Sequence, residues 1–333
     1  RETEELVTIG AAARRLDVTL ETVPFQVPTV SVRGDSGRFR EQDLQSGFSE
    51  ISAKQLARLP AVGEQDIIRS LQLLPGIQAA SDISSGLYIR GGGPDQTLIL
   101  LDQIPLYNPT HAFGFFSTFN PSAIKDVALY KGTYPAPYGG RLGAVLDVST
   151  RAGNRNKFHG QGGVSLIAAR ATLEGPIRDG SWIVSARRTY LDPILAAVRT
   201  DSSEIPDYYF YDMNARVNRS LGESDNVMLS GYRGRDDLFL DLDTGSFVEI
   251  TWGNLAGTAR WTHRFSPGLF GNFLVAASRY TSDTEVSIFS TPIRFGNRLL
   301  DVSVKADLDW RLGRSHEIDA GLLASRFHFT FDQ

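Results

Sequence analysis

The sequence predicts a small α+β domain followed by an extended antiparallel β-sheet, and three observations support this fold class. Between residues 46 and 155, helix-like segments alternate with strand-like ones. From about residue 158 onwards helical periodicity nearly disappears, and roughly nine segments alternate apolar and polar residues with a period of two. Turn-forming stretches such as SLGESDN, RFSPGLF and RLGRSH separate these segments. The chain therefore changes character near residue 155.

The composition is that of a folded protein and excludes several function classes. Of the 333 residues, 41% are hydrophobic and 22% are charged, which is enough for a packed core. The net charge of −4 argues against a nucleic-acid binder, because such a protein needs a basic patch. The absence of cysteine excludes a thiolate metal site, a cysteine nucleophile and a disulfide scaffold. No Gly-x-Ser-x-Gly, His-Glu-x-x-His or paired-carboxylate pattern occurs, so we expect no enzyme, no catalytic residue and no cofactor.

The first elements of the α+β domain are two predicted helices. Ser52–Leu59 begins with a serine that can cap the helix N-terminus. Glu64–Leu74 places Ile67, Ile68 and Leu71 on one helical face. Pro75 and Gly76 end this second helix.

The stretch LYIRGGGPDQTLILLDQIPL, from Leu87 to Leu106, follows the helices and raises the question of a phosphate-binding loop. A dinucleotide or P-loop motif requires its glycines to lead into a helix, and a P-loop also needs a lysine. Here Thr97–Asp102 looks like a strand, so we expect Leu87–Arg90 and Thr97–Asp102 to pair as an antiparallel hairpin. Gly92 or Gly93 should take a positive φ in its turn. Side chains expected beneath the second helix are Ile89, Leu98 and Leu100.

The α+β domain ends with two predicted strands. Pro121–Asp126 reads as a short helical turn, and Val127–Lys131 and Ala144–Thr150 read as strands. The loop YPAPYGGRLG lies between the two strands.

Two architectures fit the repeated strands after residue 158. One is a soluble antiparallel sheet whose apolar face meets a core, and the other is an outer-membrane barrel whose apolar face meets lipid. The segments are about 10–15 residues long, whereas soluble strands average about 5–6. Their polar faces are densely charged, as where Val304, Leu308 and Trp310 alternate with Lys305 and Asp307. These features favour the barrel, which needs no run of about 18 apolar residues.

A long, ordered series of motifs resembles the plug domain of TonB-dependent outer-membrane receptors. The matching pieces are LPAVGEQDIIRSLQLLPGIQ, LYIRGGGPDQTLILLDQIPLYNP and NPSAIKDVALYKGTYPAPYGGRLGAVLDVSTR. They cover about a third of the chain. The all-β remainder is then similar to the first part of the family's barrel, which has about 22 strands. Roughly nine strands cannot enclose a plug, so we expect an incomplete barrel here.

The resemblance implies four regions. Residues 1–27 resemble the tail of an N-terminal carboxypeptidase-regulatory-like β domain, and 28–45 resemble a TonB box followed by a linker. Residues 46–155 correspond to the plug domain, and 156–333 to the N-terminal part of the outer-membrane β-barrel.

The resemblance also implies a function. A receptor of this kind imports a scarce nutrient ligand across the bacterial outer membrane, and the ligand class stays open between siderophore, cobalamin, oligosaccharide and peptide. The implied partners are TonB, bound by strand addition, the extracellular ligand, outer-membrane lipid and, in some receptors, a surface lipoprotein. The mature chain would lie in the outer membrane after removal of a signal peptide. The alternative is a non-transporting outer-membrane or secreted β-rich binding or adhesion protein, and a secreted module of this kind should be soluble.

Candidate site residues follow from the same comparison. The box-like segment, alternatively an ordinary strand, comprises Thr29, Val30, Ser31 and Val32. Ligand-facing plug loops, whose residues could equally pack within their loops, contain Tyr107, Asn108, His111, Phe113, Tyr134 and Tyr138. Charges expected to pair between plug and barrel are Arg90, Asp102 and Arg141. His111 lacks a partner at metal-ligand spacing, so no metal site is expected.

Overall fold

The computed structural model describes residues 47–52, 55, 65–79, 86–198, 205–242, 245–313 and 315–333. The chain divides into two units, Arg1–Asp43 and Leu44–Gln333, and the first lies outside the described residues. Three sequence predictions fall there or in a gap: the domain tail at 1–27, the box-like segment within 28–45 and most of the helix at 52–59.

The N-terminal domain is built on a five-stranded sheet. In spatial order its strands are β1 (Phe48–Ser52), β8 (Ile124–Tyr130), β9 (Ala144–Thr150), β4 (Thr97–Leu101) and β5 (Ile104–Pro105). β4 and β9 are parallel, and the other neighbours are antiparallel. Its remaining short elements are α3 (Ile67–Leu71), β2 (Ile77–Ala79), β3 (Leu87–Ile89), β6 (Thr110–His111) and β7 (Phe116–Ser117), with 3-10 turns at Pro94–Gln96 and Ala112–Gly114. β9 has the bounds that its sequence predicted, whereas the strand β8 already begins inside the predicted helical turn at Pro121–Asp126.

The predicted hairpin between residues 87 and 102 is wrong. β3 pairs with β2, and β4 pairs with β5 and β9. Ile89 and Gly92 exchange backbone hydrogen bonds of 3.0 and 2.9 Å, which close a tight turn directly after β3. Gly91 takes the positive φ of +86° in this turn, not Gly92 or Gly93. The 3-10 turn at Pro94–Gln96 then leads the chain away to a different sheet.

The domain core lies on both faces of the five-stranded sheet. Asp66 caps α3 by accepting a 2.9 Å hydrogen bond from the backbone of Arg69, so the helix is shorter than the predicted 64–74. Ile67, Ile68 and Leu71 are buried in one cluster together with Ile89, as predicted. The prediction that Leu98 and Leu100 also lie under this helix is wrong, because alternate residues of β4 face opposite sides. Those two pack with Tyr130 and Val145 on the other face.

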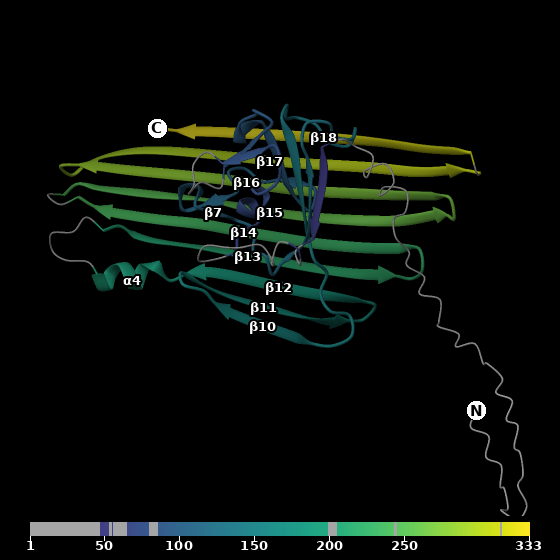
Figure 1. Cartoon of the computed structure of the whole chain (residues 1–333), viewed down its shortest axis with the longest axis horizontal. Coiled ribbons are helices and arrows are strands. Elements are labelled where there is room, and N and C mark those ends of the chain that lie inside the picture. The colour runs from purple at the N-terminus through teal and green to yellow at the C-terminus, as the bar shows by residue number, and fades with distance from the viewer. Residues whose placement is uncertain are drawn as a thin grey trace, which may run out of the picture. The chain divides into compact units, whose positions relative to one another are not determined.

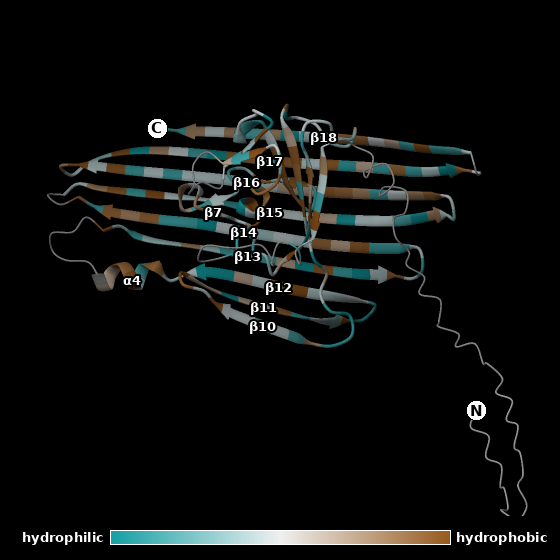
Figure 2. Cartoon of the chain, viewed as in Figure 1, coloured by the Kyte–Doolittle hydropathy of each residue, from teal (hydrophilic) through white to brown (hydrophobic). Residues whose placement is uncertain are grey.

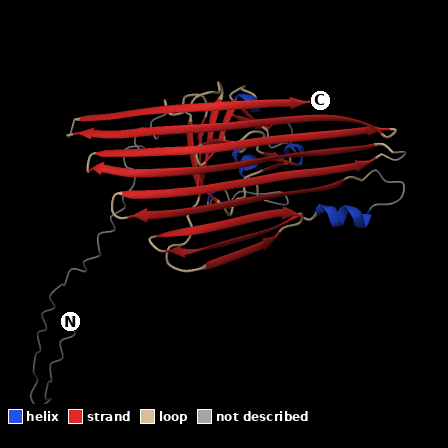
Figure 3. Cartoon of the chain, turned by 180° about the vertical axis from the view of Figure 1, so that it is seen from behind, coloured by secondary structure: helices blue, strands red, loops and turns tan. Residues whose placement is uncertain are grey.

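The second part is a nine-stranded antiparallel sheet in which each strand pairs with the next along the chain (Figure 1). Seen from behind, the strands lie side by side and α4 (Leu191–Val198) stands at one end (Figure 3). The strands are β10 (His159–Val164), β11 (Ala168–Ile177), β12 (Gly180–Thr189), β13 (Asp207–Leu221), β14 (Asp225–Asp241), β15 (Phe247–Ser266), β16 (Leu269–Ile288), β17 (Thr291–Leu312) and β18 (His316–Asp332). This sheet and the domain before it form the fold class that the sequence predicted.

The two faces of the nine-stranded sheet differ. The inner face, which contacts the N-terminal domain, contributes Tyr232, Ala256, Leu274 and Ala276 to that domain's core. The outer face is the opposite one, and along the strands apolar residues alternate with polar ones (Figure 2). On β17 the exposed outer residues include Val304 and Trp310, whereas Lys305 and Asp307 are half-buried on the inner face.

No helix within the part of the chain that the structure describes is long and apolar enough to cross a membrane.

Candidate functional site

A buried carboxylate of the sheet binds the tip of an N-terminal-domain loop. Asp236 of β14 lies 2.5 Å from Nδ1 of His111 and accepts a 2.9 Å hydrogen bond from the backbone of Ala112. Tyr208 of β13 donates its hydroxyl to the same carboxylate. His111 and Asp236 are each 1% exposed, so water does not screen this contact.

A second carboxylate, Asp212 of β13, completes the charge balance around His111. Its oxygen lies 3.7 Å from Nε2 of His111 and accepts a 2.6 Å hydrogen bond from Nε of Arg187 on β12. Arg187 also donates from Nη2 to the carbonyl of Ser117, at 2.8 Å. The imidazole stacks on Phe210, with 4.1 Å between the ring centres. Three sheet strands thus hold one loop of the N-terminal domain.

The charge state of His111 follows from these neighbours. Burial alone lowers the pKa of His111, but the hydrogen bonds and charges of Asp212 and Asp236 outweigh it and raise the pKa above the usual 6.5. His111 and Arg187 as cations then balance the two carboxylates. Removing any one of the four would leave a buried charge uncompensated.

Asp102 lies at a second ionic contact with the sheet. Its carboxylate accepts hydrogen bonds from the backbone and hydroxyl of Thr150, at 3.0 and 2.6 Å. Nη1 of Arg216 on β13 lies 3.4 Å from the same carboxylate and donates to the Thr150 carbonyl at 2.6 Å. Nearby, Arg151 reaches Glu174 of β11 at 2.7 Å.

The loop that contains Tyr107 and Phe113 is also fixed to β15, β16 and β17 of the sheet. Tyr107 donates its hydroxyl to Asp301 at 2.8 Å, and Asn254 donates to the Tyr107 carbonyl at 2.8 Å. Burial and Asp301 raise the pKa of Tyr107, so its phenol stays a donor. Further contacts join Asn108 to Tyr280 at 3.4 Å and the Phe113 ring to Trp252 at 4.8 Å. Phe113 remains 62% exposed beside these anchored residues.

The other two predicted loop tyrosines face their own domain. Tyr138 donates to Asp147 at 2.8 Å, and Tyr134 donates to the Arg141 carbonyl. Burial raises the pKa of Asp147 to about 6, which the hydrogen bond from Tyr138 partly offsets. These contacts hold the 133–143 loop against the core cluster of Leu100, Tyr130 and Val145.

The three predicted plug–barrel charges have different environments. Asp102 meets Arg216 of the sheet, as described above. Arg90 lies against two glycines, since a Cβ on Gly47 would come within 2.8 Å of its Nη2 and one on Gly132 within 3.3 Å of its Nη1. Arg141 is exposed. Among the described residues, neither arginine has an ion pair.

Sequence reasoning did not identify the sheet's side of these contacts. The missed residues are Arg187, Asp212, Arg216, Asp236 and Asp301. Each sits at an inner-face position of an alternating strand, where the sequence shows only one polar residue among many. One pattern in the sequence could have identified two of them. Asp212 and Arg216 lie on the same face of β13, and if another domain covers that face, both charges need partners in that domain or in the sheet.

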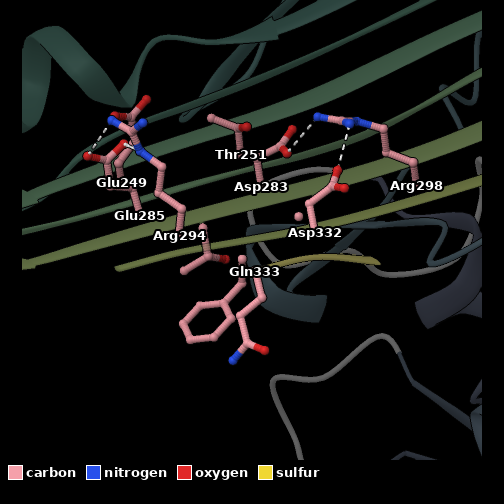
Figure 4. Close-up of a pocket in the computed structure, with 11 residues that line it drawn as sticks. Glu249, Thr251, Asp283, Glu285, Arg294, Arg298, Asp332 and Gln333 are labelled. Atoms are coloured by element: carbon pink, nitrogen blue, oxygen red, sulfur yellow. Dashed lines mark hydrogen bonds and ion pairs between the residues drawn. The ribbon is translucent and has the colours of Figure 1, made fainter. Parts of the chain in front are cut away.

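A pocket of about 340 Å³ lies elsewhere, chiefly on the outer face near the end of β18 (Figure 4). Arg298 bridges Asp283 and Asp332 in it, and Arg294 pairs with Glu285. It contains none of the predicted site residues. Among the described residues, no group of three or more acidic or histidine side chains could hold a metal ion.

Comparisons with known proteins agree with this geometry. Residues 40–145 match the model of the TonB-dependent Receptor Plug Domain. The ferrienterobactin receptor of Escherichia coli K12 is 29% identical over 154 residues, which cover 40% of this chain and 20% of that protein. The ferric enterobactin receptor PirA of Pseudomonas aeruginosa is 27% identical over 165 residues, covering 43% and 22%. The outer membrane transporter YddB of E. coli has a similar fold, with a TM-score of 0.63 at 13% identity over 84% of this chain and 48% of that one.

The fold and its ionic contacts define a class of protein: a plug domain seated on one face of an antiparallel barrel sheet. The chain is similar to the TonB-dependent receptors, and its residues 40–145 match the plug domain of that family. It spans about a fifth of the length of these curated relatives and about half of the similar solved structure.

Proposed function

We propose that this chain provides the plug and nine strands of a bacterial outer-membrane receptor that imports a scarce ligand with energy supplied through TonB. The observation that supports this most strongly is the ionic seating of the plug by His111 and Asp102. Buried ion pairs contribute little net stability compared with apolar packing. They suit an interface that holds a defined position and also has to separate when force is applied.

The outer face of the sheet supports a position within a membrane. On β15, exposed apolar residues extend from Leu255 through Trp261 to Phe265. This span has ten residue steps, about 34 Å along the strand. At a strand tilt of about 40° its height is about 25 Å, which matches the apolar band of outer-membrane barrels.

Loop tips of the plug are the proposed ligand-facing surface. Phe113 is 62% exposed, and Tyr107, Asn108 and His111 fix its loop to the sheet. Tyr134 and Tyr138 belong to the second proposed tip. The names of two relatives include ferric enterobactin, so ferric siderophores come first for testing. Cobalamin, oligosaccharides and peptides are the other classes to test.

The proposal is tested by uptake in cells. A strain lacking the full-length receptor should lose accumulation of its iron-labelled siderophore, and restoring the gene should restore it. Accumulation should also fail in a strain without TonB, while binding of the siderophore at the cell surface persists. Binding without any TonB-dependent accumulation would instead favour the alternative, a non-transporting binding protein. Recovery of the receptor outside the outer-membrane fraction would reject both its placement and its transport role.

A further inference from the structure

On the strands β12 to β17, the first charged residues above the apolar band of the outer face are all arginines. Because residues paired across antiparallel strands share a face, the strand register places them in two adjacent rows toward the α4 end. We call this set the arginine rim: Arg188, Arg233, Arg235, Arg279 and Arg298. Carboxylates come only in the next row, where Asp237, Thr251, Asp283, Gly296 and Asp332 lie side by side.

Three members of the arginine rim have carboxylate partners. Arg188 pairs with Asp192 at 2.9 Å, and Arg235 pairs with Asp237 at 3.1 Å. Arg298 pairs with Asp332 at 2.8 Å and with Asp283 at 3.6 Å, at the pocket of Figure 4. These pairs neutralise much of the rim's charge.

The other two members have no such partner. Arg233 and Arg279 are exposed, and among the described residues neither forms an ion pair. Both lie opposite Leu255, so they stand two strands apart on one row, about 10 Å from each other. Each is on a strand with a neighbour on both sides, so the surrounding outer face is already formed. An exposed arginine at the edge of an apolar band, without a carboxylate, is available to bind an anion from outside the protein.

We propose that Arg233 and Arg279 dock an anionic, phosphate-bearing lipid head group of the surrounding leaflet. The inference rests on the proposed membrane position. The chemistry is complementary, since guanidinium groups bind phosphate oxygens in a bidentate manner. Leu255 between the two arginines, and Gly257 and Ala277 in the next row down, offer the acyl chains an apolar surface directly below the phosphate.

The test measures lipid binding to the full-length receptor purified in a non-ionic detergent. The probe is short-chain phosphatidylglycerol, titrated by native mass spectrometry. Short-chain phosphatidylcholine, which is zwitterionic and has no net charge, is the comparator. Replacing Arg233→Gln and Arg279→Gln together should weaken phosphatidylglycerol binding about 25-fold, because each arginine near an anionic membrane surface contributes roughly a factor of five. The affinity of the wild type should also fall with added salt.

The control variant removes the same number of positive charges from paired arginines. Arg294→Gln with Arg298→Gln should change phosphatidylglycerol affinity less than twofold, because their carboxylates already satisfy those guanidinium groups. Equal losses in both double variants, or no loss in the first, would overturn the docking site. A variant with Arg233→Lys and Arg279→Lys keeps both positive charges but loses the guanidinium groups. It should bind phosphatidylglycerol more weakly than the wild type and more tightly than the glutamine variant.

Failure of this site is distinguishable from failure of the proposed function. All variants are first fractionated from cells and checked for folding by the heat-dependent mobility of barrels in gels. A wild-type receptor absent from the outer membrane would reject the membrane position. A wild-type receptor in that membrane whose lipid binding ignores Arg233 and Arg279 would reject the docking site alone.

Discussion

His111 makes the seating of the plug depend on pH. Its folded-state pKa is raised above the usual 6.5, so its contribution is fully present below that value. This contribution is lost as pH rises through the raised folded-state pKa. The groups that face His111 are Asp212, Tyr208 and Phe210 of β13, Asp236 and Tyr232 of β14, and Arg187 of β12.

We therefore expect plug protection against limited proteolysis of the purified receptor to fall as the pH rises above 7. His111→Gln should start less protected, by about 3–5 kcal/mol for the uncompensated carboxylates, and should lose this pH dependence. Measuring above pH 7 avoids Asp147, because its raised pKa of about 6 confines its own pH-dependent contribution to lower pH. A wild-type profile that stays flat as the pH rises above 7, while the His111→Gln profile is equally flat, would contradict the assignment of charge to His111.

Asp102 and Arg216 should be energetically coupled across the plug–sheet interface. Asp102→Asn leaves the partly buried Arg216 without its carboxylate, and Arg216→Gln leaves Asp102 with Thr150 alone. A double-mutant cycle on thermal unfolding should give a coupling energy of about 0.5–3 kcal/mol. The matched comparison is Arg141→Gln, which removes an exposed charge and should be nearly neutral. Additive effects of the Asp102 and Arg216 variants would show that their 3.4 Å contact carries no energy.

At the scale of elements, the alternation along β17 should separate two kinds of substitution. Val304 lies on the outer face near the middle of the apolar band, so Val304→Arg should destabilise the receptor by about 2–4 kcal/mol. Asp307→Asn on the inner face should cost about 1 kcal/mol or less, because Asp307 is partly solvated and has one ion pair, with Lys305. Chemical unfolding in lipid vesicles measures both. Equal costs would contradict the assignment of the two faces.

The sequence predicted strands better than it predicted their partners. β9 has its predicted bounds, and the nine strands of the sheet appear where a period of two was found. The pairing of β3 with β4 was wrong, because two strands close in sequence and joined by glycines look like a hairpin whatever their true neighbours are. The partner of β4 is β9, whose register places Thr97 opposite Ala144. These strands are far apart in the sequence, and the local residue pattern of β4 does not indicate which strand it pairs with.

For a similar reason, the residues of the plug–sheet interface could be predicted from the sequence for the plug but not for the sheet. Asp102 lies in the motif that resembles the plug, whereas Asp212 and Asp236 lie in strands with no motif. Their importance arises from burial at a contact between distant segments, 125 residues apart for His111 and Asp236. An alternating pattern gives the face of such a residue but not what covers that face.

For the whole molecule, the box-like segment gives a prediction about energy coupling. Deleting Thr29 to Val32 from the full-length receptor should abolish TonB-dependent accumulation and leave surface binding of the ligand unchanged, because the proposed strand addition to TonB would use the backbone groups of these residues. Deleting four residues of the linker at 36–39 is the matched control and should retain uptake. Unchanged uptake after the first deletion would place the box elsewhere in the protein.

The link between Tyr107 and Asp301 constrains the order in which the molecule folds. The two side chains are 194 residues apart and meet at 2.8 Å. The plug precedes the sheet in the chain, yet the loop that contains Tyr107 gains this partner only after β17 has formed. Contacts with such separation form slowly, because the intervening chain has to be ordered first. The plug is therefore synthesised first, but its contacts with the sheet form last. Until those contacts form, its polar loop residues are hydrated.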